Sequence, residues 1–274
     1  MPAIKADGTA EISARAGAQL EAAVRDAGSL ALSLFQKPIK TWTKGPSSSP
    51  VSEADIAIDA LLRERLTAGT DAFAWLSEES ADDAARLHAR YVWVVDPIDG
   101  TRAYIAGQPD WAISVALIEH DRPIMACLYA PAMDEFFAAR AGGGSSLNGK
   151  AIAATAGADL QHLRVVGPQK FLDRLSSVLP PFERLPRGHS LALRLARVAR
   201  GACDAAFAGG NSHDWDLAAA DLLVHEAGGA LTPLAGGTIA YNRPVPRHGI
   251  LIAAGRDRYA AFAELFGDER LASS

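Results

Sequence analysis

The chain has 274 residues, of which 49% are hydrophobic and 22% are charged, and its formal net charge is -5. This composition is typical of a globular protein and excludes collagen-like, disordered and membrane-spanning classes, while mild acidity without a basic block disfavours a nucleic-acid polymer or a membrane surface as partner. With no secretory leader, and with Cys127 and Cys203 far apart, we expect a cytoplasmic protein without a disulfide framework or thiolate zinc site.

The first half predicts two helices followed by a block of strands. Apolar residues recur at helical spacing from Glu11 to Phe35, and Lys37 to Pro50, rich in Lys, Ser and Pro, predicts a mobile loop. Ser52, followed by Asp55, has the pattern of a helix N-terminus. Strands are predicted at Phe73–Leu76, Tyr91–Val95, Trp111–Glu119, Ile124–Tyr129 and Phe136–Ala141. Their short connections indicate an antiparallel sheet flanked by the early helices.

From about Thr155, helices and strands alternate, which predicts a second α/β layer. Strands are predicted at Arg164–Val166, Ala205–Ala208 and Gly249–Ala254, and helices at Phe171–Val178, Leu191–Arg200, Trp215–Glu226 and Arg258–Leu265. Asp214 is expected to cap the third of these helices. We divide the chain into an N-terminal α+β domain, residues 1–152, and a C-terminal α/β domain, residues 153–274.

Acidic residues occur where the chain passes from one element to the next. They are Glu78 and Glu79 after one strand, Asp96 and Asp99 after the next, and Asp55 and Asp216 in the first turns of helices. Loops held by a rigid sheet are where binding and catalytic groups concentrate. Each acid also has an ordinary interpretation, as a turn residue, a solvated surface charge or a partner of the helix dipole.

The segment Asp96-Pro97-Ile98-Asp99-Gly100-Thr101 is the most informative of these. Pro97 ends the strand and stiffens the turn, so that two carboxylates three residues apart can point the same way. Such carboxylates repel each other, and a divalent cation relieves the repulsion; oxygen ligands suit Mg²⁺ or Mn²⁺. The amides of Gly100 and Thr101 could hold an anion if a helix begins there. A metal beside an anion site predicts a phosphate-binding centre.

Four segments, in order along the chain, resemble the inositol monophosphatase family of metal-dependent, lithium-sensitive phosphatases. They are Pro50-Val51-Ser52-Glu53-Ala54-Asp55, Ser77-Glu78-Glu79-Ser80, Trp93 to Thr101, and Trp215-Asp216-Leu217-Ala218-Ala219-Ala220 running to Glu226-Ala227-Gly228-Gly229. The resemblance covers about residues 40 to 255. It implies an α/β fold of layered αβαβα sandwich type, a homodimer, and hydrolysis of a small phosphorylated metabolite.

The resemblance also assigns roles at the site. A first Mg²⁺ would be held by Glu78, Asp96 and the Ile98 carbonyl, a second by Asp96, Asp99 and Asp216, and a weaker third by Glu78, with Mn²⁺ a possible substitute. Asp55 and Thr101 would orient and deprotonate the attacking water, and the Gly100 and Thr101 amides would hold the phosphate. Lys44, in the loop over residues 37–50, is expected to help hold phosphate or a metal-bound water.

The substrate is less constrained than the reaction. Inositol-specific members carry an acid seven positions before the Trp-Asp aspartate, where this chain has Gly209, although Asp214 could substitute in part. Arg102, present in branches resembling histidinol-phosphate phosphatases and 3′(2′),5′-bisphosphate nucleotidases, is either a bidentate phosphate ligand or a surface ion-pair residue. Ser190 lies where the family contacts the leaving group. We rank a nucleotide of the 3′-phosphoadenosine 5′-phosphate type first, inositol 1-phosphate next, and histidinol phosphate as an alternative.

Two other interpretations stay open at this point. Gly188-His189-Ser190-Leu191-Ala192 nearly matches a G-x-S-x-G nucleophile elbow, with Ser190, Asp216 and His248 in triad order and Gly142–Gly144 as an oxyanion loop. Against it, the segment before the elbow, residues 179–184, does not resemble a buried strand. The second alternative is a metal-dependent ligand-binding protein that keeps the fold without turnover.

Overall fold

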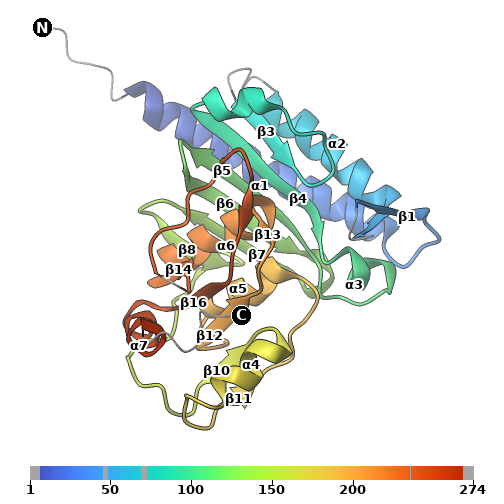
Figure 1. The fold of residues 1–274 in the computed structure, drawn as a ribbon. Helices are drawn as coiled ribbons and strands as arrows, with labels where there is room; N and C mark the ends of the chain where they lie inside the picture. The colour runs from blue at the N-terminus through green and yellow to red at the C-terminus, as the bar shows by residue number, and fades with distance from the viewer. Residues whose placement is uncertain (1–6, 46–48, 69–72, 235, 268–274) are drawn as a thin grey trace, which may run out of the picture.

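Helices and sheets alternate in five layers, in the order αβαβα (Figure 1). The computed structural model describes residues 7–45, 49–68, 73–234 and 236–267. The outer layers are α1 (Asp7–Leu34) with α2 (Glu53–Thr67) on one side and α4 (Gln169–Leu175) with α7 (Arg256–Gly267) on the other. The central layer is α5 (Leu191–Ala199) with α6 (Asp214–Glu226). This is the layered sandwich that the sequence resemblance implied.

The larger sheet has the strand order β3-β4-β5-β6-β7-β8-β9. Its strands are β3 (Phe73–Ser77), β4 (Tyr91–Asp99), β5 (Ala112–Glu119), β6 (Arg122–Ala130), β7 (Glu135–Arg140), β8 (Gly144–Leu147) and β9 (Lys150–Ala151). All neighbouring pairs are antiparallel except β3 and β4, which are parallel. That one parallel pair brings the carboxyl ends of two strands to the same edge of the sheet.

The smaller sheet has the order β11-β10-β12-β16-β14. Its strands are β10 (Arg164–Val166), β11 (Glu183–Arg184), β12 (Ala205–Ala208), β14 (Gly229–Pro233) and β16 (Leu251–Gly255). Two small pairs lie outside both sheets, β1 (Thr41–Lys44) with β2 (Ser49–Ser52) and β13 (Ser212–His213) with β15 (Arg247–His248). Short helices are α3 (Thr101–Ile105), η1 (Ala84–His88) and η2 (Pro131–Met133). No helix in these described ranges is long and apolar enough to cross a membrane.

Strand alternation decides which layer each side chain joins. In β4, Trp93 and Val95 pack with the α1–α2 layer, whereas Val92 and Val94 pack with α5 and α6. The run Ala218–Ala220 is buried on α6, where small side chains let the helix lie close to the strands of the larger sheet. The central helices therefore share one core with both sheets, which fixes α6 firmly against the end of β4.

Two predictions about local structure in the first half of the chain were wrong. The predicted loop over residues 37–50 contains a hairpin, in which Thr41 to Lys44 pair with Ser52 to Ser49; residues 46–48 lie outside the described part. The polar composition concealed the alternating, β-branched Thr-Trp-Thr pattern. The strand from Tyr91 does not stop at Val95 but continues to Asp99, since an irregular register between Asp96 and Asp99 accommodates Pro97.

Candidate metal centre and active site

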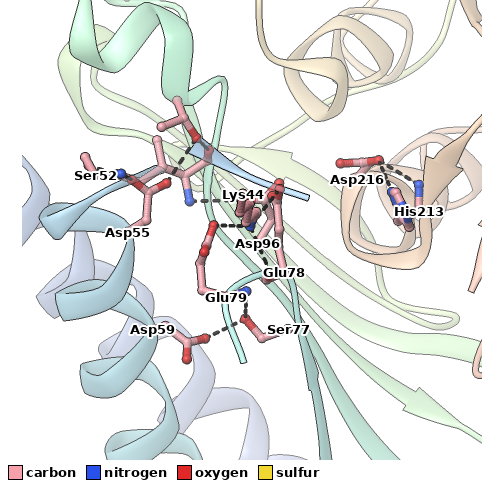
Figure 2. A network of polar contacts seen from close by, with 12 residues as sticks. Lys44, Ser52, Asp55, Asp59, Ser77, Glu78, Glu79, Asp96, His213 and Asp216 are labelled. Atoms are coloured by element: carbon pink, nitrogen blue, oxygen red, sulfur yellow. Dashed lines mark hydrogen bonds and ion pairs between the residues drawn. The ribbon is translucent and has the colours of Figure 1, made fainter. Parts of the chain in front are cut away.

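Four carboxylates from three elements meet at one end of the larger sheet. Parallel pairing puts Ser77 beside Val95, so Glu78 follows β3 where Asp96 lies in β4, and the Glu78 N–H donates to the Val95 carbonyl over 3.2 Å. Asp216 faces them from the first turn of α6 (Figure 2). One carboxylate oxygen from each of Asp96, Asp99 and Asp216 lies within 4.8 Å of the others. The predicted ligands are thus brought together.

The start of α6 is held in place by its cap and by the sheet. His213 is the N-cap, so the expectation that Asp214 would cap this helix was wrong; Asp214 is its first residue. The His213 N–H donates to Asp216 Oδ2 over 2.7 Å, and Ser114 Oγ, from β5, donates to the Trp215 carbonyl over 3.1 Å. The His213 ring stacks on Trp215 with centroids 4.5 Å apart. These contacts fix the direction of the Asp216 carboxylate.

Asp99 is held by the N-terminus of α5. Its Oδ2 accepts hydrogen bonds from Ser190 Oγ and from the Ala192 N–H, both over 2.6 Å. Ser190 Oγ also accepts from the Leu193 N–H over 3.0 Å, so it caps α5. Both of these hydrogen bonds go to the same carboxylate oxygen. Ser190, expected to contact substrate, is instead buried behind the carboxylate and does not line the cavity described below.

The carboxylates are poorly compensated within the chain. Burial raises the pKa of Asp96 well above its ordinary value, and the charges of Glu78, Asp99 and Asp216 raise it further. Burial, with Asp216, raises the pKa of Asp99 to about 7. Burial also raises the pKa of Glu78, against the opposing charge of Lys44. A divalent cation bound by these carboxylates would relieve the repulsion between them, and carboxylate oxygens are the hard ligands that Mg²⁺ prefers. The donor set therefore fits the metal dependence of the proteins it resembles.

Asp55 and Thr101 form a second functional pair. Asp55 Oδ1 lies 3.0 Å from Thr101 Oγ1, while its Oδ2 accepts from the Ser52 N–H over 2.8 Å and from Ser52 Oγ over 2.6 Å. Thr101 Oγ1 also lies 3.0 Å from the Ile98 carbonyl. The predicted capping box at Ser52 is confirmed, and it leaves the Asp55 carboxylate with one oxygen directed at Thr101.

Gly100 permits the sharp turn from β4 into α3. Its φ is +100°, and a Cβ there would lie 3.0 Å from the Asp110 carbonyl and 3.3 Å from the Ser190 nitrogen. No side chain fits without displacing backbone, so glycine is required on both conformational and steric grounds. The turn directs Thr101 back towards Asp55, and α3 does begin at Thr101.

Lys44 extends from β1 into the carboxylate cluster (Figure 2). Its Nζ lies 3.2 Å from Glu78 Oε1 and 2.6 Å from Glu79 Oε1, and it donates to the Glu78 carbonyl over 3.1 Å. Burial raises the pKa of Glu79 to about 7, against the lowering effect of Lys44. The hairpin thus places the Lys44 cation beside the acids, in a segment that the sequence had predicted to be a mobile loop.

The carboxylates open into a cavity of about 430 Å³. Its lining combines acids with cations and comprises Ser49, Pro50, Glu78, Asp96, Ile98, Asp99, Gly100, Thr101, Arg102, Arg187, Gly188, His189, Arg194 and Asp216. Arg102 is exposed at this wall. Arg194 was not predicted from the sequence as a residue of the site. It lies within an amphipathic helical pattern, where an arginine is usually expected to point to solvent. Its only signal was its position between Leu193 and Leu195, on the helix that Ser190 caps.

Asp214, also expected to contact substrate, is not brought to the cavity. It is 1% exposed; its Oδ2 accepts from the Asn242 N–H over 2.7 Å, and its Oδ1 lies 2.7 Å from His248 Nε2. The alternative triad of Ser190, Asp216 and His248 is therefore not formed, because His248 pairs with Asp214 and Ser190 with Asp99. The glycines at 142 and 144 do not form an oxyanion loop either, since both amides donate to the Glu226 carboxylate over 2.9 Å.

Comparison with known proteins supports the resemblance. Residues 14–270 match the model of the inositol monophosphatase family. The chain is 31% identical to an inositol monophosphatase of Dictyostelium discoideum, covering 78% of this chain and 83% of that protein. It is 34% identical to an inositol-1-monophosphatase of Rhizobium meliloti (strain 1021), covering 71% and 75%.

A solved structure agrees with the sequence comparisons. The extragenic suppressor protein suhB of Bartonella henselae superposes with a TM-score of 0.79 at 25% identity, covering 92% of this chain and 98% of that one. The match to the family model extends over the carboxylate cluster as well as the five layers that carry it. The chain therefore belongs to the inositol monophosphatase family of phosphomonoester hydrolases.

Proposed function

We propose that the protein is a Mg²⁺-dependent phosphatase that releases phosphate from a small phosphorylated metabolite by attack of water. The observation that carries this proposal is the cluster of Asp96, Asp99 and Asp216 oxygens, within 4.8 Å of one another, in the wall of a cavity that also contains Thr101. Family membership gives the reaction class; the donor set, all oxygen, favours Mg²⁺, with Mn²⁺ as a substitute.

The residues divide the work between metal binding and proton transfer. Glu78, Asp96 and the Ile98 carbonyl would hold one ion, and Asp96, Asp99 and Asp216 a second, with a weaker third at Glu78. When bound, Mg²⁺ lowers the pKa of a coordinated water and neutralises phosphate charge. Asp55 would accept the proton of the attacking water through Thr101, whose hydroxyl lies 3.0 Å from Asp55 Oδ1. Gly100 and Thr101 would direct their amides at the phosphate.

The cavity also supports a ranking of substrates. A nucleotide of the 3′-phosphoadenosine 5′-phosphate type comes first, because Arg102, Arg187 and Arg194 line the cavity together with the carboxylates. Inositol 1-phosphate comes next, on the names of the relatives, although Gly209 offers no carboxylate to ring hydroxyls. Histidinol phosphate is the alternative. Asp214 and Ser190 would act by positioning α6 and Asp99, rather than by touching substrate.

The proposal extends to assembly and location. The family resemblance supports a cytoplasmic homodimer. Residues 1–152 would carry most metal ligands, and residues 153–274 would complete the centre with Asp216 and supply the cations that face the leaving group. Gel filtration with light scattering tests the dimer directly.

Phosphate release tests the function. The panel contains inositol 1-phosphate, 3′-phosphoadenosine 5′-phosphate, histidinol phosphate and fructose 1,6-bisphosphate, each with Mg²⁺, with EDTA, and with Mg²⁺ plus lithium. We expect release that requires Mg²⁺ and falls with lithium. No release from any of them, by folded protein that binds Mg²⁺ in calorimetry, would contradict the proposal and favour a ligand-binding protein.

A further inference from the structure

Arg194 is a buried cation in the wall of the active-site cavity. The residue is 3% exposed. Its Nε donates to the Arg187 carbonyl over 3.1 Å, and its Nη1 lies 3.5 Å from the Phe207 carbonyl. Within the described part of the chain, no carboxylate lies at ion-pair distance from this guanidinium. It has five N–H donors, so two backbone carbonyls leave most of its hydrogen-bonding capacity unused.

Such a residue is costly unless something outside the chain compensates it. A buried charge without a counter-ion destabilises a protein, and retaining one is consistent with a ligand that supplies the opposite charge. Burial and the nearby Arg187 lower the pKa of Arg194 to about 10, so the side chain is still protonated at neutral pH. The cavity is the face from which an anion can reach it.

Two other basic residues of the cavity lining come from the chain segment next to Arg194. Arg187 and His189 come from the loop before α5, the helix that carries Arg194. His189 is already paired, because its ring Nδ1 lies 3.0 Å from Asp110 Oδ2 and its backbone N–H donates to the same oxygen over 2.6 Å. Arg187 and Arg194 therefore form a basic part of the cavity wall that comes from other elements than the carboxylates do.

We propose that the substrate carries a second phosphate on its leaving group and that Arg194, with Arg187, binds it. This rests on the proposed function, which places the first phosphate at the carboxylate cluster. The forked guanidinium matches phosphate oxygens in a bidentate manner, which favours phosphate over a single neutral hydroxyl. A cavity of about 430 Å³ is large enough for a metabolite with phosphates at both ends.

The test compares substrates that differ only in the second phosphate. Wild-type protein should prefer 3′-phosphoadenosine 5′-phosphate over adenosine 3′-monophosphate, and fructose 1,6-bisphosphate over fructose 1-phosphate, in at least one pair. In Arg194→Gln the ratio of the two kcat/KM values should fall about 10- to 100-fold, the effect of losing a charged hydrogen bond. Arg194→Lys, which keeps the charge without the fork, should lose less.

A matched control separates specificity from packing. Arg200→Gln changes the same charge at the end of α5, where the side chain pairs with Glu135 outside the cavity, and should leave the ratio unchanged. An equal loss on both members of each pair in Arg194→Gln would mean a structural role and would overturn the inference. A preference for 3-phosphoglycerate over glycerol 3-phosphate, without a preference for either bisphosphate, would also overturn the inference. It would show that Arg194 binds a carboxylate of the substrate and not a second phosphate.

A binding measurement distinguishes this inference from the proposed function. Calorimetry in EDTA compares adenosine 5′-monophosphate with adenosine, so that no metal holds the phosphate. We expect the monophosphate to bind at least about tenfold more tightly to the wild type and this advantage to disappear in Arg194→Gln. Arg194-dependent binding without hydrolysis of any substrate would defeat the proposed function alone. Mg²⁺-dependent hydrolysis with no Arg194 dependence in either assay would defeat the inference alone.

Discussion

Ser190 Oγ donates to Asp99 Oδ2 over 2.6 Å while it caps α5, so one hydroxyl connects a metal-ligand candidate to a helix N-terminus. In Ser190→Ala we expect the Mg²⁺ concentration for half-maximal activity to rise about 10- to 100-fold, because Asp99 loses an orienting partner. Loss of the cap should also cost about 1 kcal/mol of unfolding free energy. Mg²⁺ titrations of phosphate release and urea unfolding measure both effects.

Ser190→Thr is the matched control, since threonine keeps the hydroxyl and still caps a helix. It should stay near the wild type in Mg²⁺ requirement. An unchanged Mg²⁺ requirement in Ser190→Ala would show that the Ala192 N–H alone orients Asp99.

Asp96→Asn should abolish turnover and leave the fold intact, because a neutral amide cannot balance the metal charge as a carboxylate does. Burial and the neighbouring acids raise the pKa of Asp96, so removing its charge should also relieve repulsion in the metal-free protein. We therefore expect a higher melting temperature than the wild type in EDTA. Thermal unfolding with and without Mg²⁺ measures this, and full activity in the variant would overturn the metal assignment.

Lys44→Ala should lower the turnover rate about tenfold, the effect of losing one charged hydrogen bond to phosphate or to a metal-bound water. The Nζ lies 3.2 Å from Glu78 Oε1, so it is close enough to act at the centre. Lys40→Ala removes the same charge from an exposed position just before the hairpin and serves as the control. A rate in Lys44→Ala equal to that of the control would refute the role.

Asp221 predicts a pH dependence of stability away from the metal centre. Burial raises the pKa of this aspartate to about 6, although the Tyr241 hydroxyl donates to its Oδ2 over 3.1 Å. A folded-state pKa above the unfolded value of ~3.9 means that the stabilising contribution of Asp221 is complete below that unfolded value. It is lost as pH rises through about 6, the folded-state pKa.

Asp221→Asn removes this loss, since asparagine keeps an acceptor for Tyr241 without the buried charge. We expect the unfolding free energy of the variant, relative to that of the wild type, to increase by about 2 kcal/mol when the pH is raised from 4.5 to 8. Urea unfolding across that range measures it, with the nearby His225 and His248 present in both proteins. A difference that stays constant with pH would contradict the raised pKa.

Much of the chemistry was readable from local sequence, because its determinants lie within short segments. The capping box of Ser52 and Asp55, the turn at Gly100 and the carboxylates of Asp96 and Asp99 each depend on residues only a few positions apart. Period-two and helical spacing likewise predicted most strands and helices. At Thr41–Lys44 the polar composition predicted a loop, whereas the structure has a strand that pairs in a hairpin.

The tertiary structure decided which of these residues act together. Only the parallel pairing of β3 with β4 places Glu78 beside Asp96, and only the packing of α6 between two sheets brings Asp216 within reach across more than a hundred residues. The same packing buries Asp214 outside the cavity and places the buried Arg194 in the cavity wall. Residue types and turns are encoded locally, whereas burial and convergence follow from long-range layer packing, which no short segment specifies.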